Sequence, residues 1–389
     1  MTIRVNLDYY NNHHRTLLTT HQPYAAARTG ARVATYRRDP VIRRADFLSY
    51  FLIHRQALSG YQTYQDLLAK AHAASAWIGD VIIPASATIQ LVQHGYSDNG
   101  ISERIGESVG LSVISRLHGM TDADWTKLDT ISGVNGLPTF DFQTGSDGVR
   151  IIQVETKGSM VDDCTKKPSK VSNHASNIAG KKLDIDQVAI YRYPSSIRYG
   201  TITAIDATHD AQCWLLDPPA QDFSIAPQDL RIIKRLGFAA KSIALVAPNA
   251  TLPAAIAKRI NEIREGGANA FDGRVLRTTA GTPFSHQKYV EQYLSSRKTY
   301  LRDIDVVGRL LSGNRDFPIF IGMMGGIARS AIQQRFSDLV NIEYDHTDLG
   351  VHELTADGPS RDGQTGQSKH IQMRLTVSSG GFVFGHATG

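Results

Sequence analysis

Apolar residues recur at helical spacing in several stretches of the chain. From residue 102 to residue 117 they stand four positions apart, the spacing that places side chains on one face of a helix. Ser102 is a residue type that caps the start of a helix, and Gly119 suits a helix end. Similar spacing predicts two helices within residues 41–74 and one over residues 170–183.

Other stretches are short, apolar or alternating, and lie between turn-forming residues, which is typical of strands. This pattern predicts strands at residues 127–131, 139–143, 149–157, 200–206 and 212–216. A loop rich in glycine and aspartate joins the second of these to the third, so we expect those two strands to form a hairpin. The last two are expected to form another antiparallel pair.

The last third of the chain has a different pattern. An apolar run at residues 242–246 is typical of a buried strand, and a helix is expected over residues 251–266, before paired glycines. Residues 285–311 are expected to be mostly helical. A strand at residues 318–321 then leads through a glycine-rich turn into a helix at residues 327–336. This alternation of strand and helix indicates an α/β module.

The chain has 389 residues, which favours two or three domains. We expect a basic N-terminal arm with helices over residues 1–94, a core over residues 95–225, and an α/β module over residues 226–389 whose role the sequence does not indicate. The expected fold class is α/β (α+β). A homo-oligomer contact, or a contact with a partner protein, is expected to use the C-terminal module.

Two cysteines, Cys164 and Cys213, are too few for a disulfide framework or a thiolate zinc site, so we expect a cytoplasmic protein. No apolar run reaches the roughly 20 residues that a membrane helix needs, so no membrane partner is expected.

The net charge of +5 is compatible with a polyanionic partner. Arginines gather near the N-terminus with few acids and with tyrosines between them, a pattern that favours nucleic acid because guanidinium groups pair with phosphates and tyrosine rings stack on bases. A solvated tail or a subunit-contact arm is the alternative. The residues concerned are Arg4, Arg15, Arg28, Arg32, Arg37, Arg38, Arg43 and Arg44, with Tyr9, Tyr10, Tyr24 and Tyr36.

Candidate chemistry lies in the expected hairpin. Side chains alternate along a strand, so Gln153, Glu155 and Lys157 share one face, and Asp141 on the preceding strand can lie close to Glu155. Two converging carboxylates suit a magnesium ion, which prefers oxygen ligands. A lysine beside them can orient a metal-bound water, whose pKa the cation lowers. These parts are the ones that phosphodiester hydrolysis needs.

Asp141 followed by Glu155-Thr156-Lys157 resembles the signature of the PD-(D/E)xK nuclease superfamily, which includes many restriction endonucleases. The resemblance covers about a third of the chain and implies a restriction-endonuclease-like mixed sheet flanked by helices. It implies a magnesium-dependent endonuclease, with manganese as a substitute ion, that acts on DNA rather than RNA. Glu107, on the helix ahead of the hairpin, would complete the metal site. Glu103 is the alternative to it, and Gln153 would line the site.

One departure from that signature is Pro138, which stands three residues before Asp141 instead of next to it. The bare pattern also has an ordinary interpretation, because Glu and Lys on the wet side of a strand can be a cross-strand pair that stabilises by about 0.2–1 kcal/mol. A second functional hypothesis is a catalytically silent module of this fold that binds nucleic acid or a partner protein. A role in restriction or antiviral (phage) defence follows from the resemblance alone.

Overall fold

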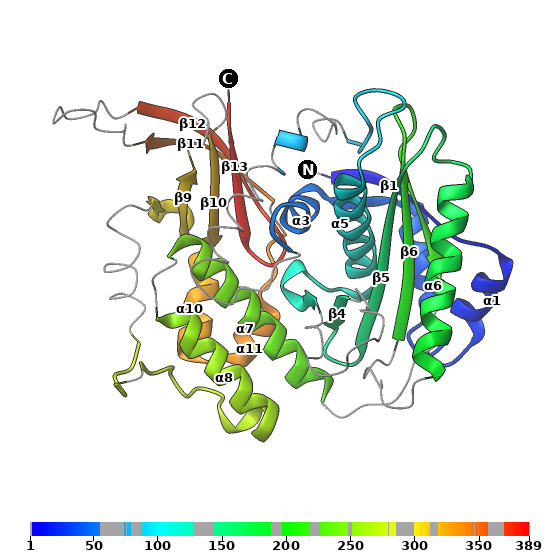
Figure 1. Cartoon of the computed structure of the whole chain (residues 1–389). Helices are drawn as coiled ribbons and strands as arrows, with labels where there is room; N and C mark the ends of the chain where they lie inside the picture. Colours follow the sequence, from blue (N-terminus) through cyan, green and yellow to red (C-terminus); the bar gives the residue numbers. More distant parts are fainter. Residues whose placement is uncertain are drawn as a thin grey trace. The chain divides into compact units, whose positions relative to one another are not determined.

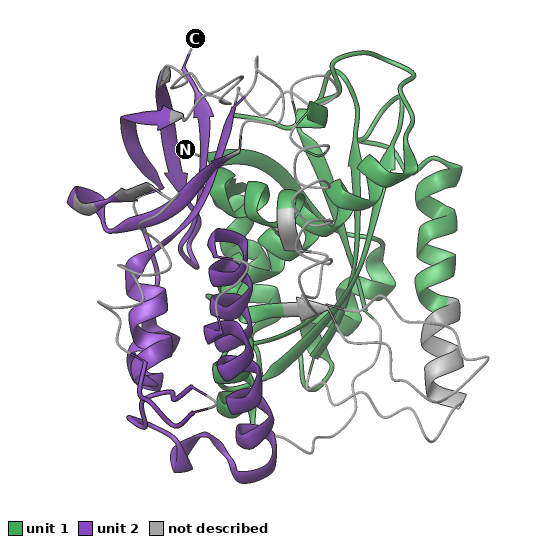
Figure 2. Cartoon of the chain, turned by 60° about the vertical axis from the view of Figure 1, so that its left-hand side comes forward, with its two compact units in different colours: residues 1–57, 69–234 green, residues 58–68, 235–389 purple. Residues whose placement is uncertain are grey.

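The computed structural model describes residues 2–54, 74, 76–78, 87–127, 143–187, 197–217, 226–247, 251–278, 280–284, 299–311, 318–345, 347–356 and 369–388. The chain divides into two compact units, which Figure 2 distinguishes by colour. Unit 1 comprises residues 1–57 and 69–234, and unit 2 comprises residues 58–68 and 235–389. This division differs from the three segments expected from the sequence, because residues 1–57 belong to the same unit as the expected core.

The described strands of unit 1 form a seven-stranded sheet in the order β2-β1-β7-β6-β5-β4-β3. Within it β1 pairs in parallel with β7, and β5 pairs in parallel with β6, whereas the β5–β4, β4–β3 and β6–β7 pairs are antiparallel. The strands are β1 (Thr2–Tyr9), β2 (Val41–Arg43), β3 (Trp125–Lys127), β4 (Gln143–Ser146), β5 (Ile151–Met160), β6 (Ile197–Ile205) and β7 (Ala211–Leu216).

Helices cover both faces of this sheet, and Figure 1 shows α5 and α6 on opposite sides of β5 and β6. The helix expected over residues 102–117 is α5, and Gly119 ends it with a φ of 63°. The expected cap was wrong: Asp98 caps the helix, and Ser102 lies within its first turn. The helix expected over residues 170–183 is α6. The helices of this unit are α1 (Asn12–Thr20), α2 (Thr29–Arg38), α3 (Arg44–Ser49) followed by a π-helical turn (Tyr50–His54), α5 (Asn99–His118) and α6 (Ser169–Gln187).

The expected hairpin is present, with shifted strand bounds. Gln143 pairs with Val154 and Ser146 with Ile151, so β4 includes residues that were expected in the loop, and the turn lies after Ser146. The second antiparallel pair is present as β6 and β7. Residues 128–142, which include most of the two expected strands before β4, lie outside the described residues.

The N-terminal segment is not a detached arm in the structure. Ile3, Val5, Leu7 and Tyr9 are buried on alternate positions of β1, and the residues between them are exposed. The pairing of β1 with β2 and β7 makes this segment an integral part of the sheet.

Unit 2 contains a described six-stranded antiparallel sheet in the order β11-β12-β13-β10-β9-β8. Its apolar core includes Phe320, Met373, Leu375 and Val383. The strands are β8 (Thr299–Leu301), β9 (Val306–Leu311), β10 (Ile319–Met324), β11 (Asp348–Ala356), β12 (Lys369–Val377) and β13 (Phe382–Ala387), and the helices are α8 (Leu252–Gly266), α10 (Gly325–Gln333) and α11 (Phe336–Asn341).

Two sequence-based expectations for the C-terminal third were wrong. Residues 242–246 are the end of helix α7 (Pro227–Val246), in which the boundary between the units falls, and do not form a strand. The described part of residues 285–311 forms β8, a 3₁₀ turn (Arg302–Ile304) and β9, and is not helical. A short apolar run cannot by itself distinguish a buried strand from a helix end. Helices long and apolar enough to span a bilayer do not occur among the described residues.

Candidate active site

Strand β5 carries the residues for which the sequence predicted chemistry. It is hydrogen-bonded on both sides, and Glu155 lies opposite Gly200 and Lys157 opposite Ile202 on β6. A Cβ atom added at Gly200 would lie 3.0 Å from Ile178 of α6, and Ile202 packs with that helix. Because side chains alternate along a strand, Gln153, Glu155 and Lys157 all point to the face covered by α6.

Glu155 and Lys157 contact each other on this face. The Lys157 Nζ atom lies 2.7 Å from Glu155 Oε1; the Lys157 side chain is 21% exposed and the Glu155 side chain is 0% exposed. Removing a carboxylate from water costs several kcal/mol, and the cost is offset only where a positive charge or hydrogen-bond donors compensate it. Lys157 supplies such a charge, and its partly exposed ammonium group is the side of the pair that water reaches.

Gln153 is buried at the start of the same row. Its Oε1 atom accepts a hydrogen bond from Arg198 Nε of β6, at 3.2 Å, and both residues are 0% exposed. Gln153 is therefore a partner of Arg198. Arg198 was missed in the sequence analysis because the strand that became β6 was expected to begin at Gly200, two residues after Arg198. A strand expected to begin before Arg198 would have placed this residue beside Gln153.

His174 of α6 is another residue of this face that the sequence did not indicate. Burial is the main cause that lowers its pKa below the ordinary value, and the charge of Lys157 lowers it further, while the backbone of Gly158 acts in the opposite direction. The imidazole is therefore biased toward its neutral form. No residue pattern in α6 marks this position, because the proximity to Lys157 arises from packing.

The expected helix glutamates come from the other face of the sheet. Cβ atoms added at Gly106 and Gly110 of α5 would lie against Lys157–Gly158 backbone and against Thr156 and Thr201, respectively. Thr156 points away from the face that bears Glu155. Glu107 is buried and Glu103 is exposed on this helix.

The structure therefore brings Gln153, Glu155 and Lys157 to one face of β5 and does not bring Glu107 or Glu103 to that face. Asp141, the first acid of the predicted signature, lies outside the described residues.

The described residues also include one group of metal-ligand types, Cys164, Asp206 and His209. The Asp206 carboxylate accepts hydrogen bonds from backbone N–H groups of Cys164, Thr208 and His209, each at 2.7 Å. Burial, and next Asp206, raise the pKa of the Cys164 thiol to about 12, which keeps it protonated. Magnesium prefers oxygen ligands, so this set of donors does not fit that ion. Its hydrogen bonds order the loop between β6 and β7.

The glycine-rich turn of residues 322–326 leads into α10, and backbone N–H groups at a helix start are donors that can bind phosphate. A Cβ atom at Gly325 would lie 2.3 Å from Asp305 Oδ1, so a carboxylate already lies at the start of α10. This negative charge opposes the binding of an anion at that position.

Comparisons with protein-family models, curated proteins and solved structures found no match for this chain.

Proposed function

We propose that this protein is a metal-dependent nuclease that hydrolyses phosphodiester bonds in DNA, with a centre built on β5. The observation that carries the proposal is the Glu155–Lys157 pair, 2.7 Å apart on a strand in the interior of the sheet. Functional sites are where buried charged groups are retained despite their cost.

The order of elements around β5 supports the same proposal. Helix α5 precedes the antiparallel meander β3-β4-β5, and α6 then leads to β6, which is parallel to β5. This is the order that the PD-(D/E)xK resemblance implies, with a helix before the hairpin and a helix and further strands after the Glu-x-Lys triplet.

In the proposed centre, Glu155 would hold magnesium or manganese through its carboxylate oxygens, the donor type that these ions prefer, and Asp141 is the predicted second ligand. The cation would lower the pKa of a bound water and stabilise negative charge on the phosphoryl oxygens. Lys157 orients the attacking water and neutralises charge beside Glu155. We leave Glu107 and Glu103 out of the centre, because α5 covers the opposite face of the sheet.

A cleavage assay with the full chain tests this proposal. Supercoiled plasmid is incubated with the protein and magnesium, manganese or EDTA. Lys157→Met and Glu155→Gln are each expected to lower the rate by at least about 100-fold. Lys166→Met is the matched control: its side chain is 77% exposed and pairs with Asp163, so the rate should stay unchanged.

Circular dichroism and tryptophan fluorescence of each variant establish that it is folded. Cleavage at the wild-type rate by folded Lys157→Met and Glu155→Gln proteins would refute the proposed centre.

A binding module without cleavage is the second candidate, and the complete burial of Glu155 favours it. A carboxylate closed off by its own lysine has less access for a cation than an open one. Magnesium should raise the melting temperature of a working metal site by mass action, whereas a silent module should show no such shift. A role in restriction or defence, and a contact through unit 2, remain predictions from the resemblance and the sequence.

A further inference from the structure

A hollow of about 260 Å³ lies between α2 and the C-terminal end of α5. Arg28, Arg32, Thr35 and Tyr36 line it from one side, and Arg116 lines it from α5. The α2 positions are spaced by three and four residues, so they share one face of that helix. We call this hollow the arginine groove.

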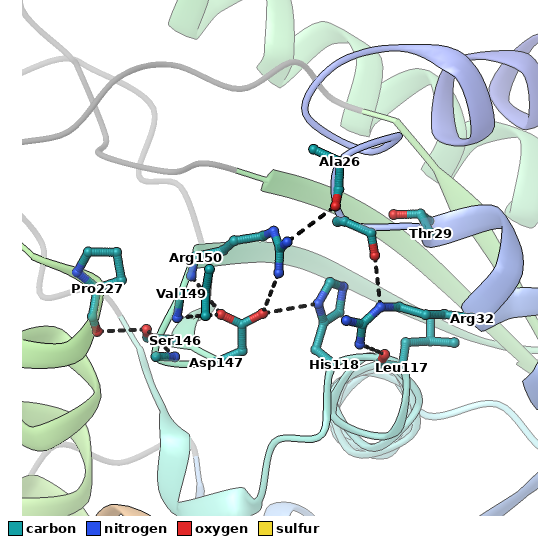
Figure 3. A network of polar contacts seen from close by, with 12 residues as sticks. Ala26, Thr29, Arg32, Leu117, His118, Ser146, Asp147, Val149, Arg150 and Pro227 are labelled. Carbon is teal, nitrogen blue, oxygen red and sulfur yellow. Dashed lines mark hydrogen bonds and ion pairs between the residues drawn. The ribbon is translucent and has the colours of Figure 1, made fainter.

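Two of its guanidinium groups are held in place by the protein. Arg32 donates from Nε to the carbonyl of Ala27 at 2.8 Å and from Nη1 to that of Leu117 at 2.5 Å. Figure 3 shows Arg32 between the segment around Ala26 and the end of α5. A guanidinium has five N–H groups, so these two bonds leave others for a ligand.

Arg116 is held in a similar way. It donates to the Val41 carbonyl and to Asp39 Oδ2, the latter at 2.6 Å, and its guanidinium lies 5.1 Å from the centre of the Tyr36 ring. Fixing donors before a ligand arrives reduces the ordering cost of binding. Both arginines also satisfy carbonyls at or near helix ends, so they serve the fold as well as the groove.

A buried chain of hydroxyl and imidazole groups fixes the two helices that form the groove. Thr29 Oγ1 lies 3.0 Å from the Tyr199 hydroxyl, which lies 3.0 Å from His118 Nε2. Thr29 begins α2 and His118 ends α5. The walls of the groove are therefore tied together through Tyr199 of the sheet.

Arg28 is the groove residue whose charge remains available. Its side chain is exposed and makes no hydrogen bond or ion pair with the described residues. Its backbone φ of 54° is in the left-handed region, which arginine rarely adopts and which persists only where the surroundings impose it. Arg28 is the residue directly before α2, so this conformation turns the chain into the helix at the edge of the groove.

The groove lies in a positively charged part of the chain. Residues 1–54 contain eight arginines, no lysine and three acids (Asp8, Asp39 and Asp46), an excess of five that equals the net charge of the whole protein. Asp39 is the acid at the groove, and it is 68% exposed where it pairs with Arg116. Arg38 extends the charge along α2 beyond the groove, whereas the guanidinium of Arg37 pairs with Asp8.

We propose that the arginine groove binds the phosphate backbone of nucleic acid. Arginine forks match phosphate oxygens, and a row of arginines along a helix suits a chain of phosphates better than one isolated anion. The proposal rests on the proposed function only in taking nucleic acid as the polymer. The groove is separate from the Glu155–Lys157 pair: Tyr199, which contacts its walls, points to the face of the sheet opposite that pair.

Binding of a fluorescein-labelled DNA duplex to the full chain, in EDTA so that no metal-dependent cleavage occurs, tests this inference. Arg28→Gln removes one available charge, and Thr35→Glu places a carboxylate among the guanidiniums at an exposed helix position. We expect Arg28→Gln to raise the dissociation constant about three- to tenfold, and to reduce the slope of log affinity against log salt by about one. Thr35→Glu should weaken binding further.

Arg264→Gln, which removes one exposed charge from unit 2, should leave binding unchanged. The binding assay contains EDTA and does not depend on cleavage, so a failed cleavage assay and a failed groove are distinguishable. The inference is overturned if Arg28→Gln and Thr35→Glu bind as the wild type does, if the wild type does not bind DNA at low salt, or if polyglutamate displaces the duplex as efficiently as unlabelled DNA.

Discussion

Substituting Gly158 with alanine tests the close approach of helix α5 to strand β5. A Cβ atom at Gly158 of β5 would lie 1.7 Å from the carbonyl oxygen of Ser102 on α5 and 2.8 Å from the backbone nitrogen of Gly106. The oxygen would have to move by about 1.3 Å to restore a contact of 3.0 Å. Both obstacles are backbone atoms, so no side-chain rotation relieves the clash.

The expected cost follows from overpacking, which typically destabilises a protein by about 1–3 kcal/mol, and occasionally by more. We expect the upper part of that range, because the helix backbone itself must move away from the sheet. Alanine also reduces the freedom of the unfolded chain relative to glycine, which offsets about 0.5–1 kcal/mol. The free energy of unfolding of unit 1 should therefore fall by about 2 kcal/mol or more.

Urea unfolding followed by tryptophan fluorescence measures this change. Trp77, Trp125 and Trp214 all belong to unit 1, so the signal reports that unit. Gly100→Ala is the matched control: it lies in an exposed turn of the same helix, where the added atom would meet only the side chain of Asp98, at 3.3 Å. We expect that control to stay within about 1 kcal/mol of the wild type. A Gly158→Ala protein as stable as the control would refute the described packing of α5 on β5.

Three further predictions concern buried polar groups of unit 1. Burial lowers the pKa of His118, against the opposing effect of Asp147, so as the pH falls the unfolded chain takes up a proton at this histidine before the folded protein does. The urea midpoint should therefore fall as the pH drops below about 6.5, and it should fall less steeply in His118→Asn. Parallel curves of urea midpoint against pH for the two proteins would contradict this prediction. Burial raises the pKa of the Cys164 and Cys213 thiols to about 12, so a disulfide reagent at pH 8 should react with both only after unfolding; immediate reaction of the native protein would contradict their burial. Tyr24→Phe removes a buried hydroxyl that donates a hydrogen bond to Asp217 Oδ1 at 2.6 Å, and it should destabilise unit 1 by about 1–3 kcal/mol in the same fluorescence assay. Unchanged stability would show that this hydrogen bond contributes nothing.

The sequence predicted the elements around β5 well because their signals are local. The four-residue spacing of apolar positions and Gly119 after them define α5 within a few residues, although the helix is capped by Asp98 and not by Ser102. Alternation along β5 correctly placed Gln153, Glu155 and Lys157 on one face. The strand pattern could not indicate which helix covers that face, because the position of a helix depends on how the chain crosses the sheet. The predicted role of Glu107 therefore came from the resemblance and not from the strand pattern.

The N-terminal strand shows a different limit. Residues 2–9 alternate between exposed and buried positions as a strand should, but the arginines that follow drew the interpretation toward a basic arm. Residues 371, 373, 375 and 377 of β12 alternate in the same way and were not assigned to a strand. The packing of His174 near Lys157, by contrast, has no local signal, because it depends on residues brought together by the fold.

The parallel pairing of β1 with β7 has a consequence for biosynthesis. Val5 pairs with Ala211, so the two partners are separated by more than half of the chain. At about 5–20 residues per second, a ribosome needs on the order of ten to forty seconds to travel between them. During that interval the nascent chain presents β1 with an apolar face and an open edge, and the sheet closes only when β7 emerges from the exit tunnel.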